Sequence, residues 1–179
     1  MRKTVAIIIL GVVISLFALL GLGAQSNELV KFNSLSADGI VLKWRVKGEN
    51  LDLVVSAKTT GWVAVGFDPA RRMKDANIII GYVKDGKVFI RDDFGVATTF
   101  HKSDVSLKRK DNVLNLSGSE SKGITTLEFS IPLDSGDKFD RKLEKGKTYK
   151  VLLAYGREDD FSAYHAYRTT AEITLKEVK

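Results

Sequence analysis

Apolar and polar residues alternate with a period of two along most of this chain, and this alternation constrains the fold more than any other feature. Ile40, Leu42, Trp44 and Val46 form one such row, and Val41, Lys43 and Arg45 alternate with them. A period of two buries one face of a β-strand and leaves the other in water. The same pattern recurs in four further segments: 51–57, 127–131, 149–155 and 171–175. No segment shows the periodicity of a long amphipathic helix, so the sequence predicts an all-β protein.

Turn signals separate these segments at short intervals. Asp38-Gly39 and 48–50 bracket one strand, and Asp85-Gly86 is a strong hairpin signal between two others. A chain of 179 residues fits one domain. We therefore expect an immunoglobulin-like antiparallel β-sandwich of about nine to eleven short strands.

The N-terminus has the layout of an export signal. A basic start, Met1-Arg2-Lys3, precedes an uncharged apolar run over 5–20 and small residues over 21–24. We predict a signal peptide over 1–24, cleaved after Ala24, which leaves a single domain over 25–179. The alternative is an uncleaved anchor, in which 5–20 tethers the domain to a membrane. Both alternatives place the domain outside the cytoplasm, in the periplasm, in the cell envelope or secreted.

Charge and cysteine content exclude several functions. The formal net charge is +6, and removal of 1–24 takes away Arg2 and Lys3 and no acid, which leaves +4. No helix-turn-helix, zinc-finger or RNA-binding pattern accompanies this mild excess, so nucleic acid is not an expected partner. The chain has no cysteine. Disulfides, thiolate metal sites and a thioether-linked haem are therefore excluded, and a transition metal must use His, Met or carboxylate ligands.

Four segments together carry a family resemblance. The first is GWVAVGFDPARRMKDANIIIGYV, which spans 61–83 and reads as a strand, a loop with one methionine and a second strand. Asp92-Asp93-Phe94 and the segment LEFSIPLDSGD over 127–137 follow, and Tyr164-His165 with Arg168 completes the set. In this order they resemble the DOMON domain family of secreted β-sandwiches, over roughly 30–176.

The resemblance implies a ligand-binding module that holds haem in some members and sugars in others. Haem-binding members hold iron between a methionine in the first loop and a late histidine, and Met73 and His165 fill these positions. A non-covalent b-type haem with both axial positions occupied is suited to one-electron transfer. Small residues commonly precede this methionine in the family, whereas Arg71 and Arg72 stand there in this chain.

Further residues complete the predicted haem site. Arginines suit the haem propionates, and aromatic side chains suit the walls of a flat pocket. The candidates for these two roles are Arg71, Arg72, Arg168, Trp62 and Tyr164. His101 has polar and charged neighbours, and we expect it to be a solvated loop residue. The electron partner would be a separate protein of the cell envelope.

Two other readings stay open. A carbohydrate-binding module would use Trp62, Tyr82, Tyr164 and Asp92 to bind a glycan without haem, and an interaction domain would bind an envelope protein without any ligand.

An enzyme is not predicted, because neither a nucleophile elbow nor a phosphate-binding loop is present. Asp92-Asp93 and Asp159-Asp160 are adjacent pairs whose side chains would point to opposite faces of a strand. The aspartates also lack the spacing of a calcium-binding loop.

Overall fold

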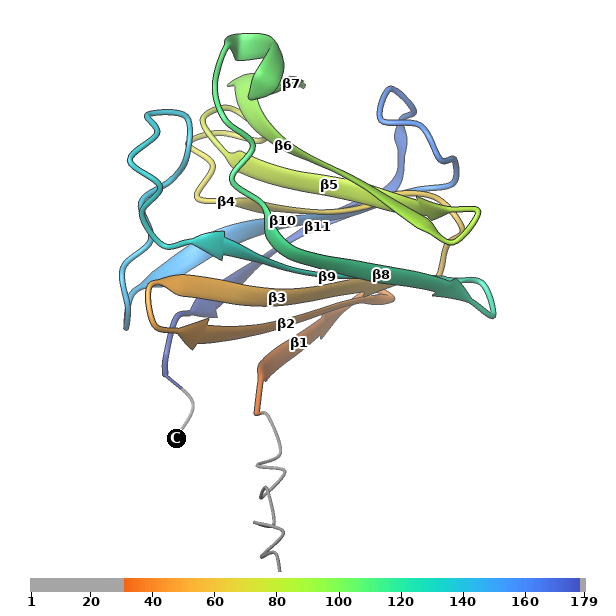
Figure 1. Cartoon of the computed structure of the whole chain (residues 1–179), viewed down its shortest axis with the longest axis horizontal. Coiled ribbons are helices and arrows are strands. Elements are labelled where there is room, and N and C mark those ends of the chain that lie inside the picture. Colours follow the sequence, from red (N-terminus) through yellow and green to blue (C-terminus); the bar gives the residue numbers. More distant parts are fainter. Residues whose placement is uncertain (1–30, 178–179) are drawn as a thin grey trace, which may run out of the picture.

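Two antiparallel β-sheets stack face to face in the computed structural model, which describes residues 31–177 (Figure 1). The five-stranded sheet contains, in spatial order, β1 (Asn33–Ala37), β2 (Ile40–Lys47), β3 (Asn50–Ala57), β9 (Ile124–Pro132) and β8 (Leu114–Ser121). The six-stranded sheet contains β11 (His165–Thr174), β10 (Thr148–Gly156), β4 (Val63–Phe67), β5 (Asn77–Lys84), β6 (Lys87–Ala97) and β7 (Phe100–Ser103). The prediction of an antiparallel β-sandwich with nine to eleven strands is confirmed.

The remaining regular element is a short 3-10 helix, η1 (Val105–Leu107), which the alternation does not predict. Within residues 31–177 no helix has the length and apolar character needed to span a bilayer. The predicted signal peptide over 1–24 lies outside the described residues.

The predicted hairpin at Asp85-Gly86 joins β5 to β6. Lys84 pairs with Lys87 across it, and Asp85 and Gly86 have φ angles of 51° and 71°. Positive φ at both central positions is typical of the two-residue turn that matches the right-handed twist of paired strands.

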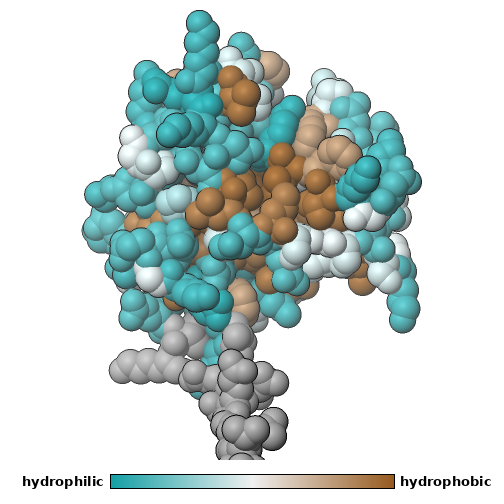
Figure 2. Space-filling model, viewed as in Figure 1, coloured by the Kyte–Doolittle hydropathy of each residue, from teal (hydrophilic) through white to brown (hydrophobic). Residues whose placement is uncertain are grey.

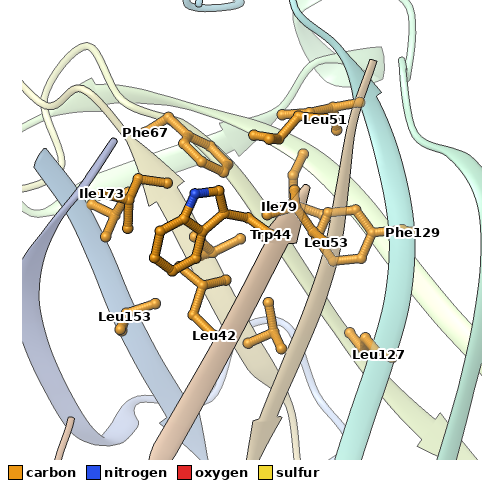
Figure 3. Packing of buried hydrophobic residues seen from close by; sticks show 14 of the residues in the cluster. Leu42, Trp44, Leu51, Leu53, Phe67, Ile79, Leu127, Phe129, Leu153 and Ile173 are labelled. Carbon is orange, nitrogen blue, oxygen red and sulfur yellow. The ribbon is translucent and has the colours of Figure 1, made fainter. Parts of the chain in front are cut away.

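The inner rows of the two sheets form one core (Figure 3). Leu42 and Trp44 come from β2, Leu53 comes from β3, and they meet Phe67 and Ile173 of the other sheet. The indole N–H of Trp44 donates to the carbonyl oxygen of Thr174 at 3.0 Å. Trp44 therefore fills the core with its ring and links the two sheets with its polar atom.

β4 is buried on both faces. Val63, Val65 and Phe67 face the main core, whereas Ala64 points to the opposite face of its sheet. There it packs in a second cluster, which we call the outer cluster. Its buried members are Trp62, Ala64 and Ile80, and the half-buried Tyr82, Ala154 and Phe161 pack against them.

Strand β8, by contrast, is an edge strand that leaves apolar side chains in solvent. Leu114 and Leu116 are 42% and 41% exposed, and Ile124 at the start of β9 is 44% exposed. Figure 2 shows apolar atoms at the surface on this side of the molecule, surrounded by hydrophilic residues. The two layers are thus less completely closed at this edge than around β4.

Truncation of a core residue tests the assignment of inner and outer rows. Leu53 is 1% exposed, and Leu53→Ala should lower the free energy of unfolding by about 3 kcal/mol, since it removes buried atoms and leaves a cavity. Lys43→Ala on β2 is the matched control, because Lys43 is exposed, and it should change stability by less than about 0.5 kcal/mol. Chemical denaturation measures both. Equal effects of the two substitutions would contradict the assignment.

Candidate functional site

Met73 lies in a tight turn within the loop that joins β4 to β5. The backbone N–H of Lys74 donates to the Arg71 carbonyl at 3.0 Å, which closes a four-residue turn with Met73 at its third position. Arg72 has a φ of 51°, in the left-handed region that side chains other than glycine and asparagine rarely adopt. Glycine would adopt this conformation without strain, whereas a residue with a Cβ atom adopts it at a cost. Arg71 and Arg72 are exposed, and Met73 is half-buried.

The turn is fixed to β6 by backbone contacts around Gly95. Asp75 N–H donates to the Gly95 carbonyl at 2.7 Å, and Gly95 N–H donates to the Ala76 carbonyl at 2.9 Å. Met73 N–H also donates to the carbonyl oxygen of Thr98 at 3.3 Å. A Cβ atom on Gly95 would lie 1.6 Å from the Met73 carbonyl oxygen. Gly95 is therefore required for this docking, although sequence reasoning singled out only the Asp92-Asp93-Phe94 block before it.

His165 is the first residue of the edge strand β11, where it pairs with Gly156. Its Nε2 atom lies 2.6 Å from Nη1 of Arg168. A guanidinium can only donate, so Nε2 accepts this hydrogen bond through its lone pair. A histidine nitrogen with a lone pair is the atom that binds metals.

Trp62 lies beneath the loop that joins β10 to β11. It is 5% exposed, and a Cβ atom on Gly156 would lie 2.1 Å from its Nε1 atom. The Trp62 Nε1 donor is buried without a hydrogen-bond partner, which is uncommon and costs free energy. Tyr164 in the same loop is 93% exposed. An open depression of about 480 Å³ lies here, and its lining is mainly charged or small: Arg157, Glu158, Asp160, Ala163, Tyr164 and Ala166.

The predicted ligands Met73 and His165 lie at opposite ends of β4. Phe67, which precedes the Met73 loop, pairs with Val151, whereas Val63 pairs with Tyr155 next to the His165 loop. Five residues of β4 separate these ends by about 13 Å. Figure 1 shows the β4–β5 and β10–β11 loops at opposite ends of the strands of this sheet. The structure thus groups Arg71 and Arg72 with Met73, and Trp62, Tyr164 and Arg168 with His165.

Small and apolar side chains occupy the sheet face between the two loops. Ala64 and Ala154 belong to the outer cluster, and Gly66 follows two residues after Ala64 on the same face. The contacts of a Cβ atom on Gly66 would be with Ile78 and Leu152, at 3.1 and 3.3 Å. The sheet face between the two loops is therefore apolar and closely packed.

The structure corrects the prediction that His101 is a solvated loop residue. His101 lies in β7 and is half-buried, and its Nδ1 is 2.5 Å from the buried carboxylate of Asp93. Arg91 contacts the same carboxylate with two nitrogens at 2.7 and 3.0 Å. The polar neighbours of His101 in the sequence do not reveal this bond, because Asp93 reaches it across a strand pair.

The residues of the glycan-binding reading do not share one surface. Asp92 pairs with the core residue Ile79 and is 1% exposed, so it faces the interior. Trp62 and Tyr82 belong to the outer cluster, and Tyr164 is in solvent. The adjacent residues Asp92 and Asp93 do lie on opposite faces of β6, as the strand geometry predicts.

Substitution of Gly95 tests the docking of the Met73 loop. Gly95→Ala should displace the loop and destabilise the protein by about 2 kcal/mol, because the added methyl group meets backbone rather than a flexible side chain. The displaced loop should become a trypsin substrate at Arg71, Arg72 and Lys74. Limited proteolysis with mass spectrometry locates the cuts. Val96→Ala is the control, since Val96 is exposed, and equal cleavage of both variants would contradict the docking.

Comparison with solved structures identifies the same fold in two cytochrome domains. The cytochrome b domain of pyranose dehydrogenase from Coprinopsis cinerea matches with a TM-score of 0.57 and 12% identity, over 80% of this chain and 82% of that chain. The cytochrome domain of cellobiose dehydrogenase from Myriococcum thermophilum matches with a TM-score of 0.58 and 9% identity, over 80% and 81%. At these identities the likeness shows the fold alone.

Sequence comparison adds the family. The DBH-like monooxygenase protein 1 of Mus musculus is 31% identical over 118 residues, and that of Homo sapiens is 30% identical over 118 residues. Each match covers 66% of this chain and 18% of the relative, so the matched part spans less than a fifth of these curated relatives. The family model for the DOMON domain matches residues 36–156. The chain belongs to the DOMON domain family.

Proposed function

We propose that this domain binds a b-type haem through Met73 and His165 and transfers single electrons. One observation carries the proposal. A histidine whose Nε2 accepts a hydrogen bond and a half-buried methionine flank an apolar face of the same sheet, in a fold shared with two cytochrome domains.

The donor inventory supports this pair. Met73 is the one methionine besides Met1, and His101 and His165 are the two histidines. The resemblance to the DOMON family favours the late histidine, His165, as the ligand, whereas the Nδ1 atom of His101 contacts the carboxylate of Asp93. Thioether and imidazole together favour low-spin, six-coordinate iron, and they leave no position for oxygen or peroxide. The domain is accordingly proposed as a non-catalytic module.

Haem binding would require the β10–β11 loop to approach Met73, because the two loops lie at opposite ends of β4. At His165, the Nε2 lone pair would bind iron in place of Arg168, because the same atom cannot serve both. Arg168 is then free to pair with a propionate, for which a planar guanidinium is well suited. Arg71 and Arg72, exposed beside Met73, can serve the second propionate.

The bound haem supplies the one-electron redox couple. The apolar outer cluster would exclude water from the haem, and the thioether of Met73 would raise its reduction potential. We propose a separate redox protein outside the cytoplasm as the partner. The predicted export signal supports this location.

Optical spectra of the purified chain, mixed with haem and then reduced with dithionite, test the proposal. We expect a sharp Soret band and resolved α and β bands on reduction, because both axial positions are filled. Met73→Ala and His165→Ala should each remove the six-coordinate spectrum, because each removes one ligand. Each should also weaken haem binding at least about tenfold, a loss of about 1.4 kcal/mol or more of binding free energy.

His101→Ala is the matched control, and its spectrum should equal that of the unmodified chain. A haem spectrum unaffected by both ligand substitutions would refute the proposed ligation. In that case titration with oligosaccharides, followed by tyrosine and tryptophan fluorescence, becomes the next experiment.

A further inference from the structure

Three aspartates from separate parts of the chain meet at one end of the sandwich. Asp92 lies in β6, Asp104 precedes η1, and Asp140 lies in the loop between β9 and β10. One carboxylate oxygen of each lies within 4.8 Å of those of the other two. Asp92 and Asp104 are each 1% exposed, and Asp140 is half-buried.

Asn112 orients two of these carboxylates. Its backbone N–H donates to Oδ2 of Asp92 at 3.1 Å, and its side-chain amide donates to Oδ2 of Asp140 at 2.8 Å. The Oδ1 atoms of Asp92 and Asp140 have no hydrogen-bond partner, and neither have the two carboxylate oxygens of Asp104. Four buried oxygens are thus left unpaired. The other oxygen of the Asp92 carboxylate and that of the Asp140 carboxylate are held by Asn112. Metal sites commonly have such an arrangement, in which outer hydrogen bonds orient the ligands.

Like charges make this cluster unfavourable without a cation. Burial, and next the neighbouring Asp140, raise the pKa of Asp92 to about 8. The same two causes raise the pKa of Asp104 to about 7. The adjacent Arg109 does not neutralise them with its side chain, because its guanidinium stacks over Phe139 and lies 3.9 Å from Asp137. A divalent ion would stabilise all three carboxylates in the ionised form.

A second observation, outside the three aspartates, points to a ligand in the same place. Asn77 is 5% exposed, and its side-chain oxygen Oδ1 is buried without a partner. Asn77 pairs with Phe67 and Asp92 pairs with Ile79, and both of those partners belong to the main core, so Asn77 and Asp92 share the inner face. They are diagonal neighbours on β5 and β6, a position in which Cα atoms are about 7–8 Å apart. An unpaired amide oxygen therefore lies on the same face as Asp92, on the neighbouring strand.

We propose that Asp92, Asp104 and Asp140 form a calcium-binding site. The donors are all oxygen, which hard cations prefer and which soft transition metals do not. Ca²⁺ accepts six to eight oxygens in flexible geometry, and carboxylate, amide and water oxygens can complete the shell here. Calcium would join β6, the η1 segment and the β9–β10 loop, three parts of the chain that a single sequence motif does not link.

Calorimetric titration of the full chain, freed of metals with a chelator and then exchanged into chelator-free buffer, tests the site. Calcium chloride should bind with a dissociation constant between about 10⁻⁶ and 10⁻³ M. At a hundredfold excess over the dissociation constant, calcium should raise the melting temperature by about 5–10 °C. Magnesium chloride at the same concentration should raise it less.

Asp104→Asn should abolish the heat of binding and the thermal shift. Without metal this variant should melt at or above the temperature of the unmodified chain, because the amide removes a buried like charge, and this result excludes misfolding as the cause. Asp134→Asn is the control, since Asp134 is exposed and pairs with Lys142 at 2.8 Å, and it should respond to calcium fully. No response of the unmodified chain to millimolar calcium would overturn the proposal. An equal response of both variants, or a response to magnesium alone, would also overturn it.

Discussion

Burial of β4 on both faces is the constraint on which the rest of the structure depends. Its odd-numbered residues complete the core between the sheets, and its even-numbered residues are covered by a second apolar layer. The β4 residues on the second face must be small, because the side chains of the adjacent strands leave little space above them. A Cβ atom on Gly66, for example, would lie only 3.1 Å from Ile78. A strand so enclosed cannot shift its register without moving two apolar layers, so its ends hold the two loops of the candidate site in place.

The two loops are constrained to different degrees, and this bears on how Met73 and His165 would bind iron in the proposed site. The Met73 turn is tied to β6 through Gly95 and Thr98, and Arg141 holds Asp68 at its start with a nitrogen–oxygen distance of 2.6 Å. The β10–β11 loop accepts one backbone hydrogen bond from the residue before β4, from Trp62 N–H to the Glu158 carbonyl at 3.3 Å, and its hydrogen bonds among 160–163 are local. To bring His165 close to Met73, the β10–β11 loop would therefore have to move, although its Phe161 already packs on the outer cluster.

The sequence predicts what depends on local periodicity and misses what depends on contacts across strands. Ile40 to Val46 shows the inner row of β2 directly, and Asp85-Gly86 shows the hairpin, because both signals lie within a few residues. The exposed edge strand β8 lacks a buried row and gives no such signal. His101 was misassigned because its partner Asp93 lies eight residues away on the adjacent strand. The sequence does not predict the cluster of three aspartates for the same reason, because the spacing of a calcium-binding loop applies only to residues within one short segment.

Strand β6 connects the two proposed sites through consecutive residues with different tasks. Asp92 points inward to the acidic cluster, Asp93 points outward to Arg91 and His101, and Gly95 receives the Met73 turn. An ion that fixes Asp92 would also fix the segment that follows it, because β6 is paired to β5 along its whole length as far as Phe94. The Met73 turn rests on backbone atoms immediately beyond that point. Calcium binding would therefore limit the motion of Met73, the proposed haem ligand, without any contact to it, and the position of its thioether would depend on a site on the other face of the sheet.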